Sequence, residues 1–96
     1  MHVQPTSDAN KGTTLATTFY KGKAWLYYTD SNNMIHCITG TGESWANARV
    51  LDEAPPIAPG GQLTVTSANG INHLFYYQAG DKQSTHYRDF SPKSIE

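Results

Sequence analysis

Residues 12–28 read GTTLATTFYKGKAWLYY, and residues 60–76 read GGQLTVTSANGINHLFY. The segments lie 48 residues apart, and their identical positions are Gly12 and Gly60, Leu15 and Leu63, Thr18 and Thr66, Gly22 and Gly70, Leu26 and Leu74, and Tyr28 and Tyr76. Tyr27 also recurs conservatively as Phe75. The chain of 96 residues therefore contains one unit twice. A period of about 40 to 50 residues is typical of propeller blades and other stacked units, none of which buries its apolar face alone.

Each copy predicts short antiparallel β-strands. Alternating apolar and polar positions with many aromatic and β-branched residues lie between Gly-, Asn- and Asp-rich turns, and no window carries a helix-length apolar stripe. The strands that we expect are 14–20, 24–29, 34–39 and 44–51 in the first copy, and 62–67, 71–77 and 83–88 in the second. A Pro-rich crossover at 54–61 separates the copies. The sequence therefore predicts an all-β protein with two four-stranded propeller blades per chain.

The chain is circularly permuted against its own repeat, because residues 3–15 align with residues 51–63. The second copy lacks the tail that 45–51 gives the first, and Met1 to Pro5 could complete it. We therefore expect one two-blade unit over 1–96, with blade 1 at about 14–53 and blade 2 at about 62–96 completed by 1–5.

Two blades cannot close a ring, because propellers usually carry about four to eight. An isolated pair would leave large apolar faces in water, so we expect self-assembly through heterologous contacts that close on themselves. A homotrimer with six blades is the favoured arrangement, and a dimer with four is the second. The alternative is a two-sheet β-sandwich that folds as a monomer.

Composition excludes several classes of partner. Seven Lys and Arg against eight Asp and Glu give a formal charge of −1, so there is no basic footprint for nucleic acid. The apolar runs are too short for membrane insertion, and the first residues do not have the order of a signal peptide. A soluble protein in the cytosol, or one secreted without a leader, is the expectation. The single cysteine, Cys37, cannot form an internal disulfide.

Two segments resemble a known family. Tyr27-Tyr28-Thr29-Asp30-Ser31-Asn32-Asn33-Met34-Ile35, followed by Gly42-Glu43-Ser44-Trp45, is similar to the blade motif of the fungal fucose-binding lectins and their short two-blade bacterial relatives. The second copy matches through Leu74-Phe75-Tyr76-Tyr77-Gln78 and Gly60-Gly61-Gln62-Leu63. The resemblance implies a six-bladed propeller, which the short members reach by trimerising, and the binding of fucose or a related glycan.

The residues that bind fucose in that family are largely replaced in this chain. The family's Arg positions hold Trp25 and His73, and its Glu position holds Cys37 in the first copy and either Thr85 or His86 in the second. Of its two tryptophans, only one is matched, by Trp45. Neither Trp nor His offers the charged planar fork of Arg. Either another glycan binds through aromatic stacking and neutral polar groups, or the blades are chiefly structural.

Candidate ligand contacts follow from these positions and from the chemistry of sugars, which need an aromatic face for C–H groups and polar groups for hydroxyls. The set that we expect is Trp25, Trp45, His73, His86, Cys37 and Tyr77. Each aromatic in it has an alternative role in core or cross-strand packing. Tyr28 and Tyr76, which repeat at one blade position, are predicted to be core residues.

Signals for enzymes, metals and cofactors are weak. The histidines, His2, His36, His73 and His86, match no metal-ligand spacing, and His36 and Cys37 point to opposite faces of a strand. Cys37 lacks the geometry of a catalytic dyad, and most acidic residues fall in turns. We therefore predict a multivalent glycan-binding lectin without catalysis, metal or cofactor. The alternative is a structural or protein-interaction propeller whose sugar sites have decayed.

Overall fold

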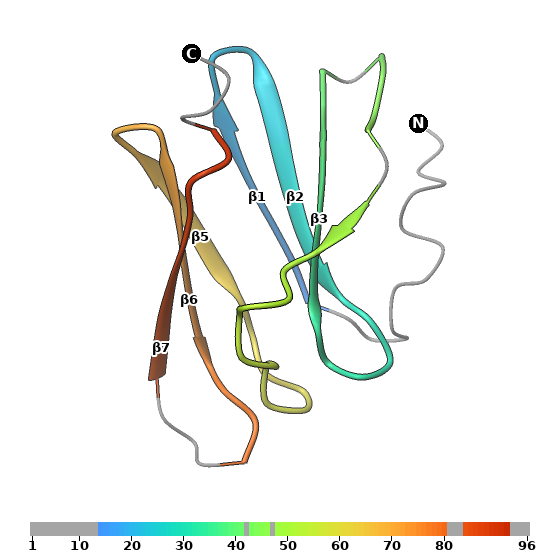
Figure 1. Cartoon of the computed structure of the whole chain (residues 1–96), viewed down its shortest axis with the longest axis vertical. Coiled ribbons are helices and arrows are strands. Elements are labelled where there is room, and N and C mark those ends of the chain that lie inside the picture. Colours follow the sequence, from blue (N-terminus) through green and yellow to red (C-terminus); the bar gives the residue numbers. More distant parts are fainter. Residues whose placement is uncertain (1–13, 42, 47, 81–83, 93–96) are drawn as a thin grey trace.

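The computed structural model describes residues 14–41, 43–46, 48–80 and 84–92, and this part of the chain is all-β, as predicted (Figure 1). One antiparallel sheet has the order β1-β2-β3-β4, and the other has the order β5-β6-β7. The strands of the first sheet are β1 (Leu15–Tyr20), β2 (Lys23–Thr29), β3 (Ile35–Gly40) and β4 (Arg49–Val50). Those of the second are β5 (Thr64–Ala68), β6 (Ile71–Tyr77) and β7 (Ser84–Asp89). The expected use of Met1 to Pro5 falls outside the described residues.

Both sheets begin with the same tight hairpin. Lys21 and Gly22 connect β1 to β2 with φ angles of 51° and 79°, and Asn69 and Gly70 connect β5 to β6 with φ angles of 56° and 78°. Two central residues with positive φ define the turn whose twist matches that of the flanking strands. Glycine at the second position adopts this conformation without steric cost, which accounts for its recurrence in both copies.

Strand pairing repeats along with the sequence. β6 begins and ends 48 residues after β2, and the pair Ala16↔Tyr27 recurs as Thr64↔Phe75. The third strand is shifted by one further residue, because Tyr27 pairs with Cys37 whereas Phe75 pairs with His86. His86, rather than Thr85, is therefore the structural equivalent of Cys37.

The fourth strand of the first copy is shorter than the predicted 44–51. Only Arg49 and Val50 join the ladder, and Trp45 forms an isolated bridge with Gly40. The Trp45 ring lies so close to Gly40 that a Cβ atom there would sit 2.7 Å from Trp45 Cδ2. This packing of the ring against the end of β3 takes the place of a regular ladder.

The core lies between the two sheets, and strands β1 and β5 run close to each other (Figure 1). Its buried members are Trp25, Tyr27, Ile35, Cys37, Leu51, Ala54, Ile57, Leu63, Leu74 and Tyr76. The crossover closes one end of this layer, because Ala58 N donates to Tyr77 O and Ala79 N donates to Pro56 O, each at 2.8 Å. Tyr76 is buried as predicted, and its hydroxyl donates to Pro55 O at 2.7 Å.

The two sheets bury opposite faces of the repeated unit. In the first sheet, the face with Tyr27 and Cys37 points into the core. The equivalent residues of the second sheet, Phe75 and His86, lie on its exposed side, and its core face instead carries Leu74 and Tyr76. The sheets are therefore stacked head to tail. The second sheet leaves its other face exposed, whereas the other face of the first sheet carries both exposed Leu15 and Phe19 and buried Tyr28 and Ile38.

Candidate functional site

Two predicted ligand residues, Trp25 and Cys37, lie in the core between the sheets. Each is 1% exposed. Trp25 Nε1 donates to Ser91 Oγ at 3.3 Å, which ties the first sheet to the end of β7. Burial raises the pKa of the Cys37 thiol to about 12, so the group is neither a thiolate nor accessible. In this arrangement both side chains stabilise sheet packing, and neither presents a surface to a ligand.

A polar network beside Trp25 joins the sheets. Tyr27 donates its hydroxyl to Asp89 Oδ2 at 2.6 Å, and Arg49 donates to the same oxygen and to Ser91 Oγ, each at 2.8 Å. Asn72 Nδ2 donates to the Tyr27 hydroxyl at 2.8 Å. Burial raises the pKa of Tyr27 above its usual range, so the phenol stays a donor. Sequence reasoning missed this network, because its side-chain hydrogen bonds join residues 40 or more positions apart.

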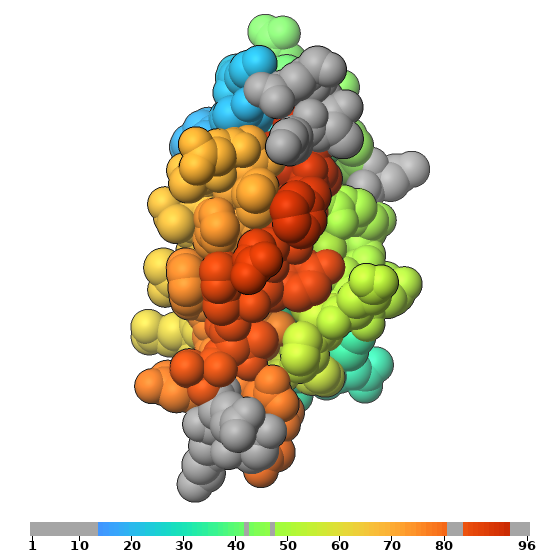
Figure 2. Space-filling model, turned by 60° about the vertical axis from the view of Figure 1, so that its left-hand side comes forward, coloured from blue at the N-terminus to red at the C-terminus, as the bar shows by residue number. Residues whose placement is uncertain are grey.

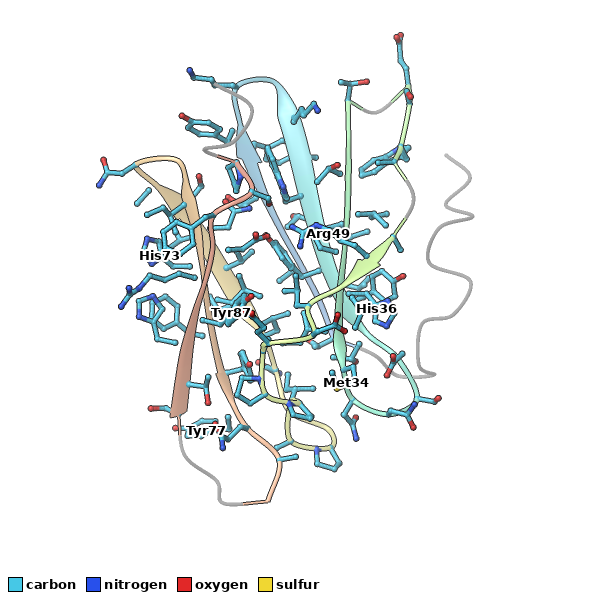
Figure 3. The ribbon with its side chains drawn as sticks, viewed as in Figure 1. Met34, His36, Arg49, His73, Tyr77 and Tyr87 are labelled. Carbon is cyan, nitrogen blue, oxygen red and sulfur yellow. The ribbon has the colours of Figure 1, made fainter. Side chains whose placement is uncertain are left out.

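Three predicted ligand residues gather on the outer face of the second sheet. His73 and Tyr77 share this face because alternate strand residues point to the same side, and His86 lies opposite Phe75 in the ladder. Figure 2 shows β5, β6 and β7 side by side in yellow, orange and red. Figure 3 places His73 on the outer side of the sheet, whereas Arg49 lies between the sheets.

The rings on this face contact one another. His73 Nδ1 and His86 Nε2 are 2.8 Å apart, so one ring donates an N–H to the other. The Phe75 ring lies parallel to His86, with centroids 4.6 Å apart and an angle of 10° between the planes. Phe75 is 45% exposed and Tyr77 is 60% exposed. A sheet surface with this much exposed aromatic area is a candidate contact surface.

An open groove of about 680 Å³ follows these rings. The residues that line it are Gln62, Thr64, Phe75, Tyr76, Tyr77, Ser84, Thr85 and His86. Hydroxyl and amide groups thus stand beside exposed aromatic rings. The Thr85 hydroxyl donates to Gln78 Oε1 at 2.9 Å, so it is already engaged within the chain.

One cationic side chain, Arg88, lies on the sheet face that carries the groove. Arg88 pairs with His73 across β6 and β7, which puts its side chain on the same outer face. The pKa of His86 is lowered by desolvation and then by the charges of Arg88 and His73. On this face, the described strand residues include no acidic side chain.

The sixth predicted residue, Trp45, lies elsewhere, on the outer side of the first sheet. It lines a shallow groove of about 290 Å³ together with Thr17, Phe19, Gly22, Ala24, Gly40 and Thr41. Phe19 is 72% exposed there. Within one chain, therefore, Trp45 is separated from His73, His86 and Tyr77.

Asp30 and His36 form a hydrogen bond at the β2–β3 turn. His36 Nε2 lies 2.6 Å from Asp30 Oδ2, while Asp30 Oδ1 accepts from the backbone N–H groups of Asn32 and Met34. Although desolvation acts to raise the pKa of Asp30, these hydrogen bonds lower it. The pattern is that of a turn-stabilising carboxylate. Across the described ranges, no group of three His, Cys, Asp or Glu side chains could hold a metal ion.

No family model, curated protein or solved structure matches this chain. In addition, no helix in the part of the chain that the structure describes has the length and apolar character needed to span a membrane.

Proposed function

We propose that this chain is a non-catalytic carbohydrate-binding protein, and that its groove on the second sheet receives the sugar. The observation that carries the proposal is the pair of exposed rings, Phe75 and Tyr77, in a groove with Gln62, Thr64 and Ser84. An aromatic face with hydroxyl and amide groups at its edge matches the two-sided chemistry of a pyranose. The resemblance to the fucose-binding lectins supports the same ligand class.

We further propose that copies of the chain assemble head to tail into a closed ring, with three copies giving six blades. Two faces support this: the exposed face of the second sheet is equivalent to the buried face of the first, and the outer face of the first, where Tyr28 and Ile38 are buried, is equivalent to the buried face of the second. Exposed apolar side chains lie on both of these faces, with Leu15 and Phe19 on the first sheet and Phe75 and Tyr77 on the second. A contact between copies would therefore repeat the packing already present inside one chain.

Repetition of the internal contact would place Trp45 beside the groove. Inside the chain, Tyr27 reaches Asp89. The equivalent pair between copies is Phe75 of one copy and Gly40 of the next, and Trp45 packs on Gly40. The proposed sugar site thus lies at the junction between copies, with Trp45 and the second-sheet residues on its two sides.

One observation favours the alternative, a structural or protein-interaction propeller. Trp25 and Cys37, which stand where the resembling lectins carry their fucose-binding Arg and Glu, are buried packing residues here. The open faces would then serve assembly alone.

Native mass spectrometry combined with a glycan array tests the proposal. We expect a trimer that carries up to three sugars, and we expect Tyr77→Ala to lower array binding about tenfold, because stacking losses of about 1 kcal/mol are multiplied across several sites. Phe90→Ala is the matched control, since Phe90 is 54% exposed but does not line the groove. A trimer that binds no glycan favours the alternative, and a bare monomer contradicts the ring.

A further inference from the structure

Among the residues that the structure describes, the outer face of the second sheet carries the positive charge of Arg88 and no negative charge. Arg88 is exposed and has no ion-pair or hydrogen-bond partner within residues 14–41, 43–46, 48–80 and 84–92. The only acidic strand residue nearby in sequence, Asp89, is buried and engaged by Arg49 on the other side of the sheet. A guanidinium in this setting is a free binding group for an anion.

The cationic and proton-donating groups lie together on the sheet face that carries the groove, and one of them, His86, lines it. His73 is the cross-strand partner of Arg88, and His86 lies two residues before Arg88 on the same face. The imidazole pair is joined through a single proton, since only one N–H fits between nitrogens 2.8 Å apart. The other nitrogen of each ring is available to contact a ligand. The two bonded nitrogens, His73 Nδ1 and His86 Nε2, are too close together to admit a metal ion between them, because Zn–N distances are about 2.0 Å.

We infer that the sugar recognised in this groove carries a carboxylate, which Arg88 and the His73–His86 pair bind while the sugar ring lies on Phe75 and Tyr77. This inference rests on the proposed carbohydrate-binding function and names its ligand class.

The chemistry of the groove favours an acidic sugar over a neutral one. Arg presents parallel N–H groups that match the two oxygens of a carboxylate. A neutral sugar would cover the guanidinium without supplying an anion, and the desolvation of an unpaired charge weakens binding. A carboxylate removes that penalty and leaves the hydroxyls of the sugar for Gln62, Thr64 and Ser84.

Binding of an acidic sugar should also depend on pH. The group of this face whose pKa is shifted is His86, which faces His73 and Arg88, while β5 places Thr64 and Thr66 beside it. A bound carboxylate favours the charged imidazole, so affinity rises as pH falls from 7.5 to 5.5. The limit is about tenfold per pH unit for uptake of one proton. The sugar carboxylate itself stays ionised in this range, because such groups titrate near pH 3 to 4.

Isothermal titration of the full chain tests the inference with N-acetylneuraminic acid, glucuronic acid and the methyl ester of each, at pH 5.5 and 7.5. We expect at least one acid to bind about tenfold or more tightly than its ester, and the acid that does so identifies the source of the carboxylate. Arg88→Gln should abolish this preference, and Arg88→Lys should retain part of it. Lys23→Gln removes an equal charge from the first sheet and should leave the preference intact.

Equal binding of acid and ester overturns the acidic ligand but leaves carbohydrate binding in place. Failure of all four compounds, and of fucose and galactose, to bind overturns both.

Discussion

Replacement of Tyr27 by Phe tests whether the polar network holds the two sheets together. The Tyr27 hydroxyl is fully buried, donates to Asp89 at 2.6 Å and accepts from Asn72 at 2.8 Å. Loss of a hydrogen bond to a charged group costs about 1.5 to 3 kcal/mol, and a buried amide without a partner costs about 1 to 3 kcal/mol. Asp89 keeps its bonds to Arg49 and to Ser91 N, which limits the first cost. Asn72 Oδ1 has no hydrogen-bond partner among the described residues, and the substitution would also remove the partner of Asn72 Nδ2.

We therefore expect Tyr27→Phe to lower the free energy of unfolding by about 3 kcal/mol, measured by urea unfolding at one fixed protein concentration. Tyr76→Phe, which removes one bond to a neutral carbonyl, should cost about 1 kcal/mol. Tyr77→Phe, on the open face, should change the unfolding free energy by less than about 0.5 kcal/mol. If Tyr27→Phe and Tyr77→Phe have the same effect, the network does not contribute to sheet packing and the reasoning fails.

Three further perturbations probe other parts of the fold. Cys37 should react with a thiol reagent at pH 8 only after urea unfolds the chain, because burial raises its pKa to about 12; rapid reaction of the native protein would contradict its burial. Asp30→Asn should cost about 1 kcal/mol at pH 7 in thermal unfolding. The folded pKa of Asp30 is lowered, so its stabilisation is present above the unfolded value of about 3.9 and is lost as pH falls through the folded one; a difference that persists at pH 2 would refute this. Gly40→Ala should lower the free energy of unfolding by about 1 to 3 kcal/mol and alter tryptophan fluorescence. The reason is that the added Cβ would lie 2.5 Å from Ser44 O and 2.7 Å from the Trp45 ring. An unchanged spectrum and stability would mean that Trp45 does not pack there.

The sequence predicts the strands far better than it predicts which of their faces is buried. Ile71–Tyr77 matches the expected strand, and Lys23–Thr29 differs from it by one residue, because two-residue turns with glycine fix where hairpins begin. Trp25 on β2 and Cys37 on β3, however, stand on strands whose two faces both carry aromatic or apolar residues. Which face packs depends on the sheet opposite, and that is set by tertiary structure. The close approach of Trp45 to Gly40, which shortens the fourth strand, likewise leaves no local pattern.

The register of the second copy shows a similar limit. Five residues connect β2 to β3, whereas six connect β6 to β7, so the repeat of 48 fails within the third strand. Backbone pairing identifies His86 as the equivalent of Cys37, and alternation then places it on the face of His73 rather than that of Thr85. Sequence comparison alone leaves both residues as candidates, because neither is chemically similar to Cys37.

The internal junction and the proposed junction between copies differ in how well they are filled. Inside the chain, Trp25 and Tyr27 meet Asn72, Asp89 and Ser91, and large side chains with a bonded polar network close the space.

The residues equivalent to Trp25 and Tyr27 on the open face are the smaller His73 and Phe75, whose ring lacks a hydroxyl. Those equivalent to Asn72 and Asp89 on the opposing face are Ala24 and Gly40, which cannot form the polar network. A junction built from these residues repeats the stacking of the sheets. It leaves space beside Trp45 and lacks the hydrogen bonds of the internal network. In the proposed ring, the junction between the two sheets of one chain is therefore filled, and the junction between neighbouring chains retains space for a ligand. This favours one sugar site per copy rather than one per blade.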